Sequence, residues 1–374
     1  MQSNSEQPTC ADEVDGWLRS RRESRPGAKV RIVGCGSRQH EREPLPAETA
    51  PLDLSGLDTI VRLDAGDQTC TVEAGVTRAA LDQALAEHQL ELPCLGSGSL
   101  GGLFASDPIG PASIAGQSPR SLLLGLDGAL ADGTPFRSGA KVVKSVAGFD
   151  VHKLFVGSHG RLFVAKRLHL RLKPAPRARR WFASVPLGRA PALAQTHALR
   201  SLPIPPDVLA LERSRDASFR IVGQMSGRER TVDSVLREHG LTAMASDERQ
   251  REEHLLSSAR IRSNASAATG AGTPPEEIDG GATPSQLELL LATIDQHAPD
   301  MPVRWFAGCR FRAASGNAAT SDRLLEAWHK LGIVAQVRAS EDASRLGRST
   351  PTDAGQLHLT SRLKEALDPD GIFI

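Results

Sequence analysis

The chain has 374 residues and a formal net charge of +1, with 40% apolar and 24% charged residues. This length and composition are typical of a globular protein with two domains, each with a core of its own. The near-neutral charge, the absence of tyrosine and the 4% aromatic content argue against nucleic-acid binding, which needs basic surfaces and stacking rings.

The cysteines are scattered, and no pair has the CxxC spacing of a metal or redox site. They are Cys10, Cys35, Cys70, Cys94 and Cys309. The N-terminal residues lack the apolar stretch of a signal peptide, and no segment approaches the ~20 apolar residues of a membrane helix. We therefore expect a cytoplasmic chain without a metal site or a transmembrane segment. Any peripheral association with a membrane is expected to be through partner subunits.

Strand-like and helix-like segments alternate along the first hundred residues. A helix is expected at 11–21 with Val14, Trp17 and Leu18 on one face. A strand is expected at 29–33, ending in the turn "GCGS", and two further strands within 57–76. Thr77 can cap the helix that follows. The stretch "CLGSGSLGGLFASDPIGP" at 94–111 contains so much glycine, serine and proline that no regular element is expected there.

The segment "KSVAGFDVHKLFVGSHGRLFVAKRLHLRLK" at 144–173 predicts a short helix, a glycine-rich loop and a strand. Asp150 lies at the N-cap position of the helix, and Gly157 ends it. Three leucines then alternate with basic residues, which is the period of a half-buried strand. Gly157 and Gly160 lie between helix and strand, where the backbone could approach a ligand closely or simply turn.

The sequence lacks several common motifs, and their absence argues against several classes of site. In "GCGSRQ", Gln39 stands at the place of the third glycine of a dinucleotide fingerprint, and the sequence has no G-x-x-x-x-G-K-[ST] phosphate loop. It also contains no HExxH and no GxSxG motif, so neither a zinc protease nor an α/β-hydrolase nucleophile is indicated.

Five segments in a fixed order carry a resemblance to a known family. They are "VRIVGCGSR", "VEAGVTRAALDQALAEHQLELPC", "GSLGG", "KVVKSVAGFDVHKLFVGSHGRLFVAKRLHLRLKPAP" and "RLKEALDPDGIF". Together they resemble the FAD-binding PCMH-type flavoproteins, the family of vanillyl-alcohol oxidase and p-cresol methylhydroxylase. Within that family the likeness is greatest to the glycolate oxidase subunits of the GlcE type. It is strong up to Pro176, weak through the middle and clear again near the C-terminus.

The resemblance implies an α+β fold in which two subdomains hold FAD and a second domain covers the flavin ring. It implies an FAD-binding PCMH-type domain at 1–175 and a smaller α+β cap or substrate domain at 176–356. A flexible loop is expected near 263–285, and the C-terminal segment 357–374 is expected to return to the FAD domain.

The same resemblance implies that glycine-rich loops bind FAD, because converging backbone N–H groups suit the two negative charges of a diphosphate. Ser37 stands near the place of the histidine that carries a covalent flavin in the family, so noncovalent binding is expected. The implied cofactor-binding residues are Val33, Gly34, Cys35, Gly36, Ser37, Arg38, Ser99, Leu100, Gly101, Gly102, Ser106, Gly148, Asp150, Gly157, Gly160 and Val164.

Departures from the family pattern leave an alternative open. Phe163 stands where a glycine is usual, so that its ring either fills cofactor space or points into the core. The connection 95–100 is shorter than usual, Ser121 replaces an aspartate and Phe149 replaces a tyrosine. One interpretation is therefore a structural subunit that keeps the fold without flavin, whereas the intact "GCGS", "SLGG", "AGFD" and "GSHG" favour FAD binding.

The function implied is that of an FAD-binding subunit of a glycolate or other 2-hydroxy-acid oxidase or dehydrogenase. It would relay electrons beside a catalytic flavoprotein subunit and an iron–sulfur subunit. A flavin reductase acting on a nucleotide sugar is a remoter alternative, against which the "DPDGIF" ending argues.

No catalytic residue can be named from the sequence. Oxidation of a hydroxy acid needs a base for the hydroxyl proton and cations for the carboxylate. Arg304, Arg310 and Arg312 could bind a carboxylate, although an amphipathic strand with solvated arginines is the simpler interpretation. His159 could donate a hydrogen bond to the cofactor or be an exposed loop residue.

Overall fold

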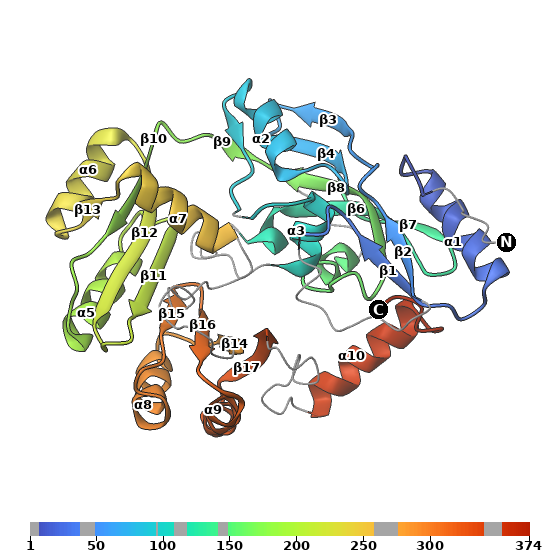
Figure 1. Cartoon of the computed structure of the whole chain (residues 1–374). Helices are drawn as coiled ribbons and strands as arrows, with labels where there is room; N and C mark the ends of the chain where they lie inside the picture. The colour runs from blue at the N-terminus through green and yellow to red at the C-terminus, as the bar shows by residue number, and fades with distance from the viewer. Residues whose placement is uncertain are drawn as a thin grey trace.

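The computed structural model describes residues 7–37, 49–94, 96–107, 118–140, 149–257, 276–339 and 354–374. Two units lie side by side, and the C-terminal helix runs back along the first of them (Figure 1). The last strand of the first unit ends at Pro174, and the first strand of the second begins at Ala178.

The first unit is built on a five-stranded antiparallel sheet with the order β3-β4-β8-β6-β7, a parallel pair β1-β2 and a small β5-β9 ladder. Its strands are β1 Val30–Val33, β2 Ala50–Asp53, β3 Ile60–Asp64, β4 Thr69–Glu73, β5 Leu90–Glu91, β6 Leu123–Ala129, β7 Pro135–Gly139, β8 Val164–Arg171 and β9 Lys173–Pro174. Its helices are α1 Glu13–Ser24, α2 Arg78–Ala86, α3 Leu100–Ser106, α4 Pro119–Leu122, the 3₁₀ turn η3 Val151–Leu154 and α10 Ala354–Leu367.

Local sequence signals explain several of these elements. The α1 helix buries Val14, Trp17 and Leu18 on one face, as predicted. The hydroxyl of Thr77 accepts a hydrogen bond from the N–H of Ala80 at 3.2 Å and so caps α2, which is also confirmed.

The stretch expected to be irregular contains the helix α3, so that prediction is wrong. Ser99 caps this helix by accepting from the Gly102 N–H, and Leu103 and Phe104 are fully buried beneath it. The glycines serve close packing, because a Cβ on Gly101 would lie 2.8 Å from the carbonyl oxygen of Ala74.

The helix expected after Asp150 is reduced to η3, a single 3₁₀ turn, and the Asp150 side chain makes no capping hydrogen bond. In β8, Leu168 and Leu170 are buried as predicted, but the opposite face is not open to solvent throughout. His169 is only 4% exposed, because its Nδ1 pairs with the Thr71 hydroxyl at 3.0 Å.

The second unit is one eight-stranded sheet with the order β13-β10-β12-β11-β15-β16-β14-β17. Each half has the chain order β-α-β-β-α-β of a ferredoxin-like module, and the halves join where β11 pairs with β15. The first half is β10 Ala178–Ala183, α5 Arg189–Arg200, β11 Val208–Arg213, β12 Phe219–Gly227, α6 Glu229–Glu238 and β13 Thr242–Ala243. The helix α7 Ser246–Ser257 follows, and the second half is β14 Glu276–Gly281, α8 Leu287–His297, β15 Val303–Phe306, β16 Arg310–Ser315, α9 Ala318–Lys330 and β17 Val334–Ala339.

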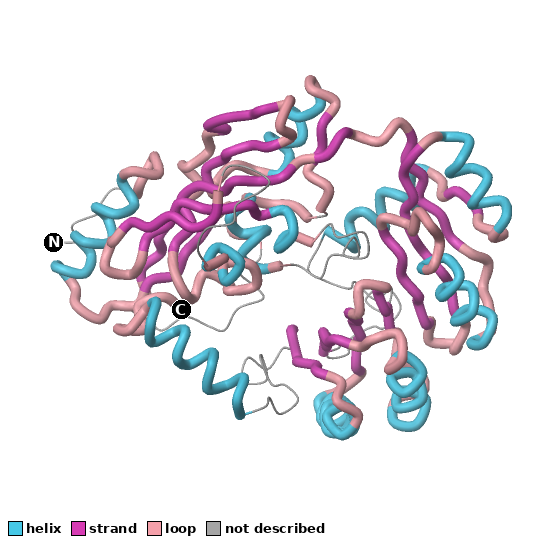
Figure 2. Tube along the Cα trace, turned by 180° about the vertical axis from the view of Figure 1, so that it is seen from behind, coloured by secondary structure: helices cyan, strands magenta, loops and turns pink. Residues whose placement is uncertain are grey.

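The two faces of this sheet differ in chemistry. Alternate residues such as Leu209, Leu211 and Trp305 form the core against the helices α5, α6, α8 and α9, on the side away from the first unit (Figure 2). The other face is turned toward the first unit and carries α7 (Figure 1).

The flexible loop expected near 263–285 is only partly open to comparison, since 258–275 lie outside the described residues. For 276–281 the expectation is wrong, because this segment is β14, paired on both sides with β16 and β17. Within this strand Gly280 makes room for an aromatic ring, since a Cβ there would lie 2.4 Å from Phe311.

Candidate cofactor site

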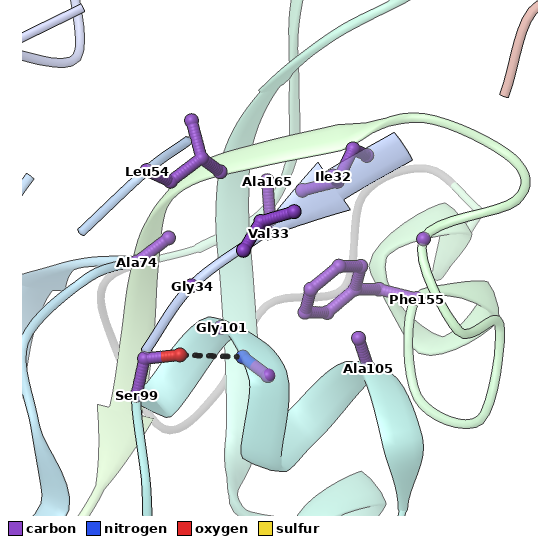
Figure 3. A pocket seen from close by; sticks show the side chains of 12 residues that line it. Ile32, Val33, Gly34, Leu54, Ala74, Ser99, Gly101, Ala105, Phe155 and Ala165 are labelled. Atoms are coloured by element: carbon purple, nitrogen blue, oxygen red, sulfur yellow. Dashed lines mark hydrogen bonds between the residues drawn. The ribbon is translucent and has the colours of Figure 1, made fainter. Parts of the chain in front are cut away.

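A small pocket lies where the end of β1 meets α3 and the loop before β8 (Figure 3). It encloses about 50 Å³, enough for one group of a dinucleotide rather than all of it. Its walls carry no charged side chain, and the lining residues are Ile32, Val33, Gly34, Leu54, Ala74, Ser99, Gly101, Gly102, Ala105, Phe155, Gly160 and Ala165.

The first wall is the loop that follows β1. Gly36 has φ +69°, a left-handed conformation that glycine adopts without strain. Within the described part of the chain, no acceptor is hydrogen-bonded to the backbone N–H groups of Gly34, Cys35, Gly36 and Ser37. A run of such N–H groups is the kind of concavity that binds an anion such as a diphosphate.

The second wall is α3, whose first N–H groups already have acceptors. The N–H of Leu100 donates to Val76 O at 2.8 Å and that of Gly101 to Ala74 O at 2.7 Å. The N–H of Gly102 donates to the Ser99 hydroxyl at 3.3 Å, the dashed line in Figure 3. This helix therefore shapes the pocket by close packing, while the donors come from the first loop.

The third wall is the loop 157–160, which is fastened to the end of α3. The N–H of His159 donates to Ala105 O at 2.8 Å, and Gly160 lines the pocket with φ +73°. His159 is half-buried and also has φ +53°, so this loop is held in a conformation that only a few residue types adopt readily.

The pocket brings together part of the set of residues expected from the sequence, namely Val33, Gly34, Ser99, Gly101, Gly102 and Gly160. Cys35, Gly36 and Ser37 continue from it as an exposed loop. Arg38 and Gly148 lie outside the described residues. The remaining members of the set do not line the pocket: Leu100, Ser106, Asp150, Gly157 and Val164.

Three of these residues make other contacts. Leu100 and Val164 are fully buried in apolar clusters, and the Ser106 hydroxyl donates to Gly102 O at 2.8 Å. Sequence reasoning also missed apolar lining residues, of which Ala74 and Phe155 are examples. The only signal for them was their place in otherwise matching segments, because an apolar residue beside a ligand and one in the core look alike in sequence.

Phe163 does not lie in the pocket. It is fully buried, with its ring 5.0 Å edge-on from Phe136 and 6.0 Å stacked from Phe155. Of the two orientations that the sequence left open, the structure therefore shows the one toward the core. The Phe163 ring therefore supports the pocket wall from behind, because Phe155 lies between this ring and the pocket.

A row of charged residues crosses the face of the second sheet that is turned toward the first unit. The strand register places Arg220, Glu212, Arg304, Arg312 and Asp279 beside one another. Arg312 is only 3% exposed and lies 3.4 Å from the Asp279 carboxylate. The interpretation of Arg304 and Arg312 as solvated arginines is therefore wrong. Arg310, two residues before Arg312, is exposed.

The helix α7 adds a carboxyl group to this row. The Glu252 carboxylate lies 3.1 Å from the Arg304 guanidinium, which also contacts Glu212. Burial raises the pKa of Glu252 to about 7 and lowers the pKa of Arg304 to about 10. Burial also raises the pKa of Asp107 at the end of α3, although Arg310 and Arg120 act in the opposite direction.

Within the part of the chain that the structure describes, no cluster of three or more histidine, cysteine or acidic residues is arranged to hold a metal ion. No helix there combines the length and apolar character that crossing a bilayer requires.

Comparison with known proteins agrees with the geometry of the first unit. Residues 7–139 match the family described as FAD binding domain. The first unit is an FAD-binding domain of the PCMH type. Its cofactor is FAD, and the unpaired N–H groups of the loop after β1 fit the diphosphate of that cofactor.

Curated relatives match part of the chain. The D-lactate dehydrogenase of Archaeoglobus fulgidus is 28% identical over 173 residues, which is 46% of this chain and 38% of that protein. The glycolate oxidase subunit GlcE of Escherichia coli is 30% identical over 152 residues, which is 39% of this chain and 43% of that protein. The matched part thus spans less than half the length of these relatives.

A solved structure matches more widely. Alkyldihydroxyacetonephosphate synthase superposes with a TM-score of 0.71 at 13% identity, covering 98% of this chain and 75% of that one. This likeness shows that both units share the fold of a PCMH-type flavoprotein, in agreement with the α+β architecture expected from the sequence.

Proposed function

We propose that the chain is an FAD-linked oxidoreductase component, the FAD-binding subunit of a complex that oxidises glycolate or a related 2-hydroxy acid. The observation that carries the proposal is the run of N–H groups from Gly34 to Ser37, to which the described residues supply no acceptor, beside a pocket free of carboxylates. This arrangement suits a noncovalently held dinucleotide, because Ser37 offers no nucleophile of the kind that attaches a flavin.

FAD, when bound, supplies the hydride acceptor of the oxidation. The chain's own part is to hold the diphosphate on the loop after β1 and to keep α3 and the loop 157–160 against it. The charged face of the second sheet supports an acidic substrate. Arg310 is an exposed cation at the margin of that face, and its charge acts on Asp107 at the end of α3. We assign to Arg310 the binding of the substrate carboxylate.

The names of the relatives support the substrate class, since they include a D-lactate dehydrogenase and two glycolate oxidase subunits. A subunit of this kind would pass electrons within a complex, beside a catalytic flavoprotein subunit and an iron–sulfur subunit. The competing idea of a flavin-free structural subunit loses one of its supports, because Phe163 lies in the core.

The test begins with the absorbance spectrum of the purified full-length chain before and after addition of FAD. Acid precipitation should then release the flavin into the supernatant. Dye-linked oxidation of glycolate and D-lactate is measured next, with the chain alone and with co-expressed partner subunits. Flavin binding with hydroxy-acid oxidation only in the complex supports the proposal. A flavoprotein that oxidises neither acid under any of these conditions contradicts the proposed substrate class.

A further inference from the structure

The last residues of the chain form a compact turn after α10. The N–H of Gly371 donates to Asp368 O at 2.9 Å, and Gly371 has φ +58°. The Asp368 carboxylate is buried and accepts from the N–H groups of Ile372 and Phe373, both at 2.8 Å. The sequence "DPDG" fits this turn, because the second position of a turn favours proline and a left-handed position favours glycine.

The turn delivers the final residues to β1. The N–H of Val30 donates to Ile372 O at 2.8 Å, and the N–H of Ile374 donates to Val30 O at 3.1 Å. Phe373 pairs in parallel with Val30 and is 1% exposed in the cluster beneath it. The final residues therefore form a parallel bridge to β1, the strand that leads directly into the cofactor loop.

Lys364 connects the same turn to another wall of the pocket. Its ammonium group donates to Phe373 O at 2.7 Å and to Arg161 O at 2.6 Å, and it contacts the Asp368 carboxylate. Arg161 directly follows Gly160, which lines the pocket. One ammonium group with three partners thus connects the loop 157–160 to the C-terminal residues that pair with β1.

We propose that Lys364 is a positioning residue for FAD and that docking of the C-terminal segment and binding of FAD are one coupled equilibrium. Both the loop after β1 and the loop 157–160 must keep their spacing for the cofactor to bind, and Lys364 spans them from behind. FAD, in turn, stabilises the docked segment, because coupling between two binding events acts in both directions. The inference rests on the FAD site and is independent of the substrate class.

Three full-length variants test the role of the ammonium group by FAD titration, followed through flavin fluorescence. Lys364→Met keeps the apolar stem and should weaken FAD binding about tenfold, since it removes charge-assisted hydrogen bonds. Lys364→Arg should restore most of the affinity. Lys330→Met is the matched control: Lys330 also pairs with an acidic residue four positions away, but both side chains are about 70% exposed. This control should bind FAD as the wild type does.

Hydrogen exchange of the wild-type chain tests the coupling without any substitution. FAD should slow exchange in peptides covering 365–374 as well as in those covering 30–37. Protection confined to 30–37 would overturn the coupling, and so would unchanged FAD affinity in Lys364→Met. Equal losses in Lys364→Met and Lys330→Met would also contradict it. A wild-type chain that binds no FAD would overturn the cofactor site itself, whereas failure to oxidise hydroxy acids would leave this inference intact.

Discussion

Replacing Gly101 by alanine tests whether close packing of α3 against Ala74, the residue after β4, sets the shape of the FAD pocket. A Cβ on Gly101 would lie 2.8 Å from Ala74 O and 2.9 Å from the Ala74 Cβ, both of them rigid atoms. Ordinary contact begins at 3.4 Å, so α3 must move by about 0.6 Å. Because Ala74 and Gly101 both line the pocket, the movement changes the pocket directly.

The expected magnitude combines two opposing effects. Alanine in place of glycine stabilises a helix by up to about 1 kcal/mol, whereas overpacking costs about 1–3 kcal/mol. We therefore expect Gly101→Ala to lower the free energy of unfolding by up to about 2 kcal/mol and to weaken FAD binding by about tenfold or more.

A glycine in another helix supplies the control. Gly16 lies in α1, does not line the pocket, and a Cβ there would meet no atom within 4 Å. Gly16→Ala should therefore gain up to about 1 kcal/mol of stability in urea denaturation and bind FAD as the wild type does. A Gly101→Ala variant that matched Gly16→Ala in both measurements would refute the packing argument.

Three further predictions follow from the same structure. Phe163→Ala should lower the free energy of unfolding by about 3–5 kcal/mol in chemical denaturation, because the ring is fully buried, and should bring no gain in FAD affinity; tighter FAD binding would place the ring in cofactor space after all. Arg310→Met should raise the KM for a 2-hydroxy acid about tenfold in the assembled complex and leave the FAD dissociation constant unchanged; an unchanged KM would remove Arg310 from the substrate site. Burial raises the pKa of Glu252 from 4.5 to about 7, so the folded chain keeps a proton that the unfolded chain releases between these values. The stability that this bound proton contributes, at most about 3 kcal/mol, should be lost as the pH rises from 4.5 to about 7. Denaturation curves of Glu252→Gln should lack this part of the pH dependence.

The sequence predicted best the elements whose signals are local. The face of α1 and the cap of α2 by Thr77 are set by neighbouring residues, and both appear as predicted. The helix α3 was missed because Gly101 packs against Ala74, the residue after β4, which lies distant in sequence. The strand β14 was missed for the same reason, since Gly280 is explained only by the ring of Phe311 on the adjacent strand.

The same difference between local signals and distant contacts applies to the candidate site. Gly34 and Gly160 were named because glycine-rich loops stand out in sequence, and both line the pocket. The burial of Arg312 was not foreseen, because alternation of arginine with apolar residues is equally typical of a strand with one face in water. What decides between these interpretations is a second layer over that face, and a helix such as α7 leaves no mark on the strand that it covers.

The charged face of the second sheet has a consequence for any substrate. Arg304 already contacts Glu212 and Glu252, and Arg312 faces Asp279, so neither can turn to a new anion without leaving a buried carboxylate behind. The cost of an unpaired buried charge is several times the gain from one exposed ion pair. The buried row therefore orients the sheet and holds α7 on it, while an incoming carboxylate is left to the exposed arginine at its margin. The proposed substrate contact and the support of the sheet thus fall on Arg310 and Arg312, only two residues apart on one strand.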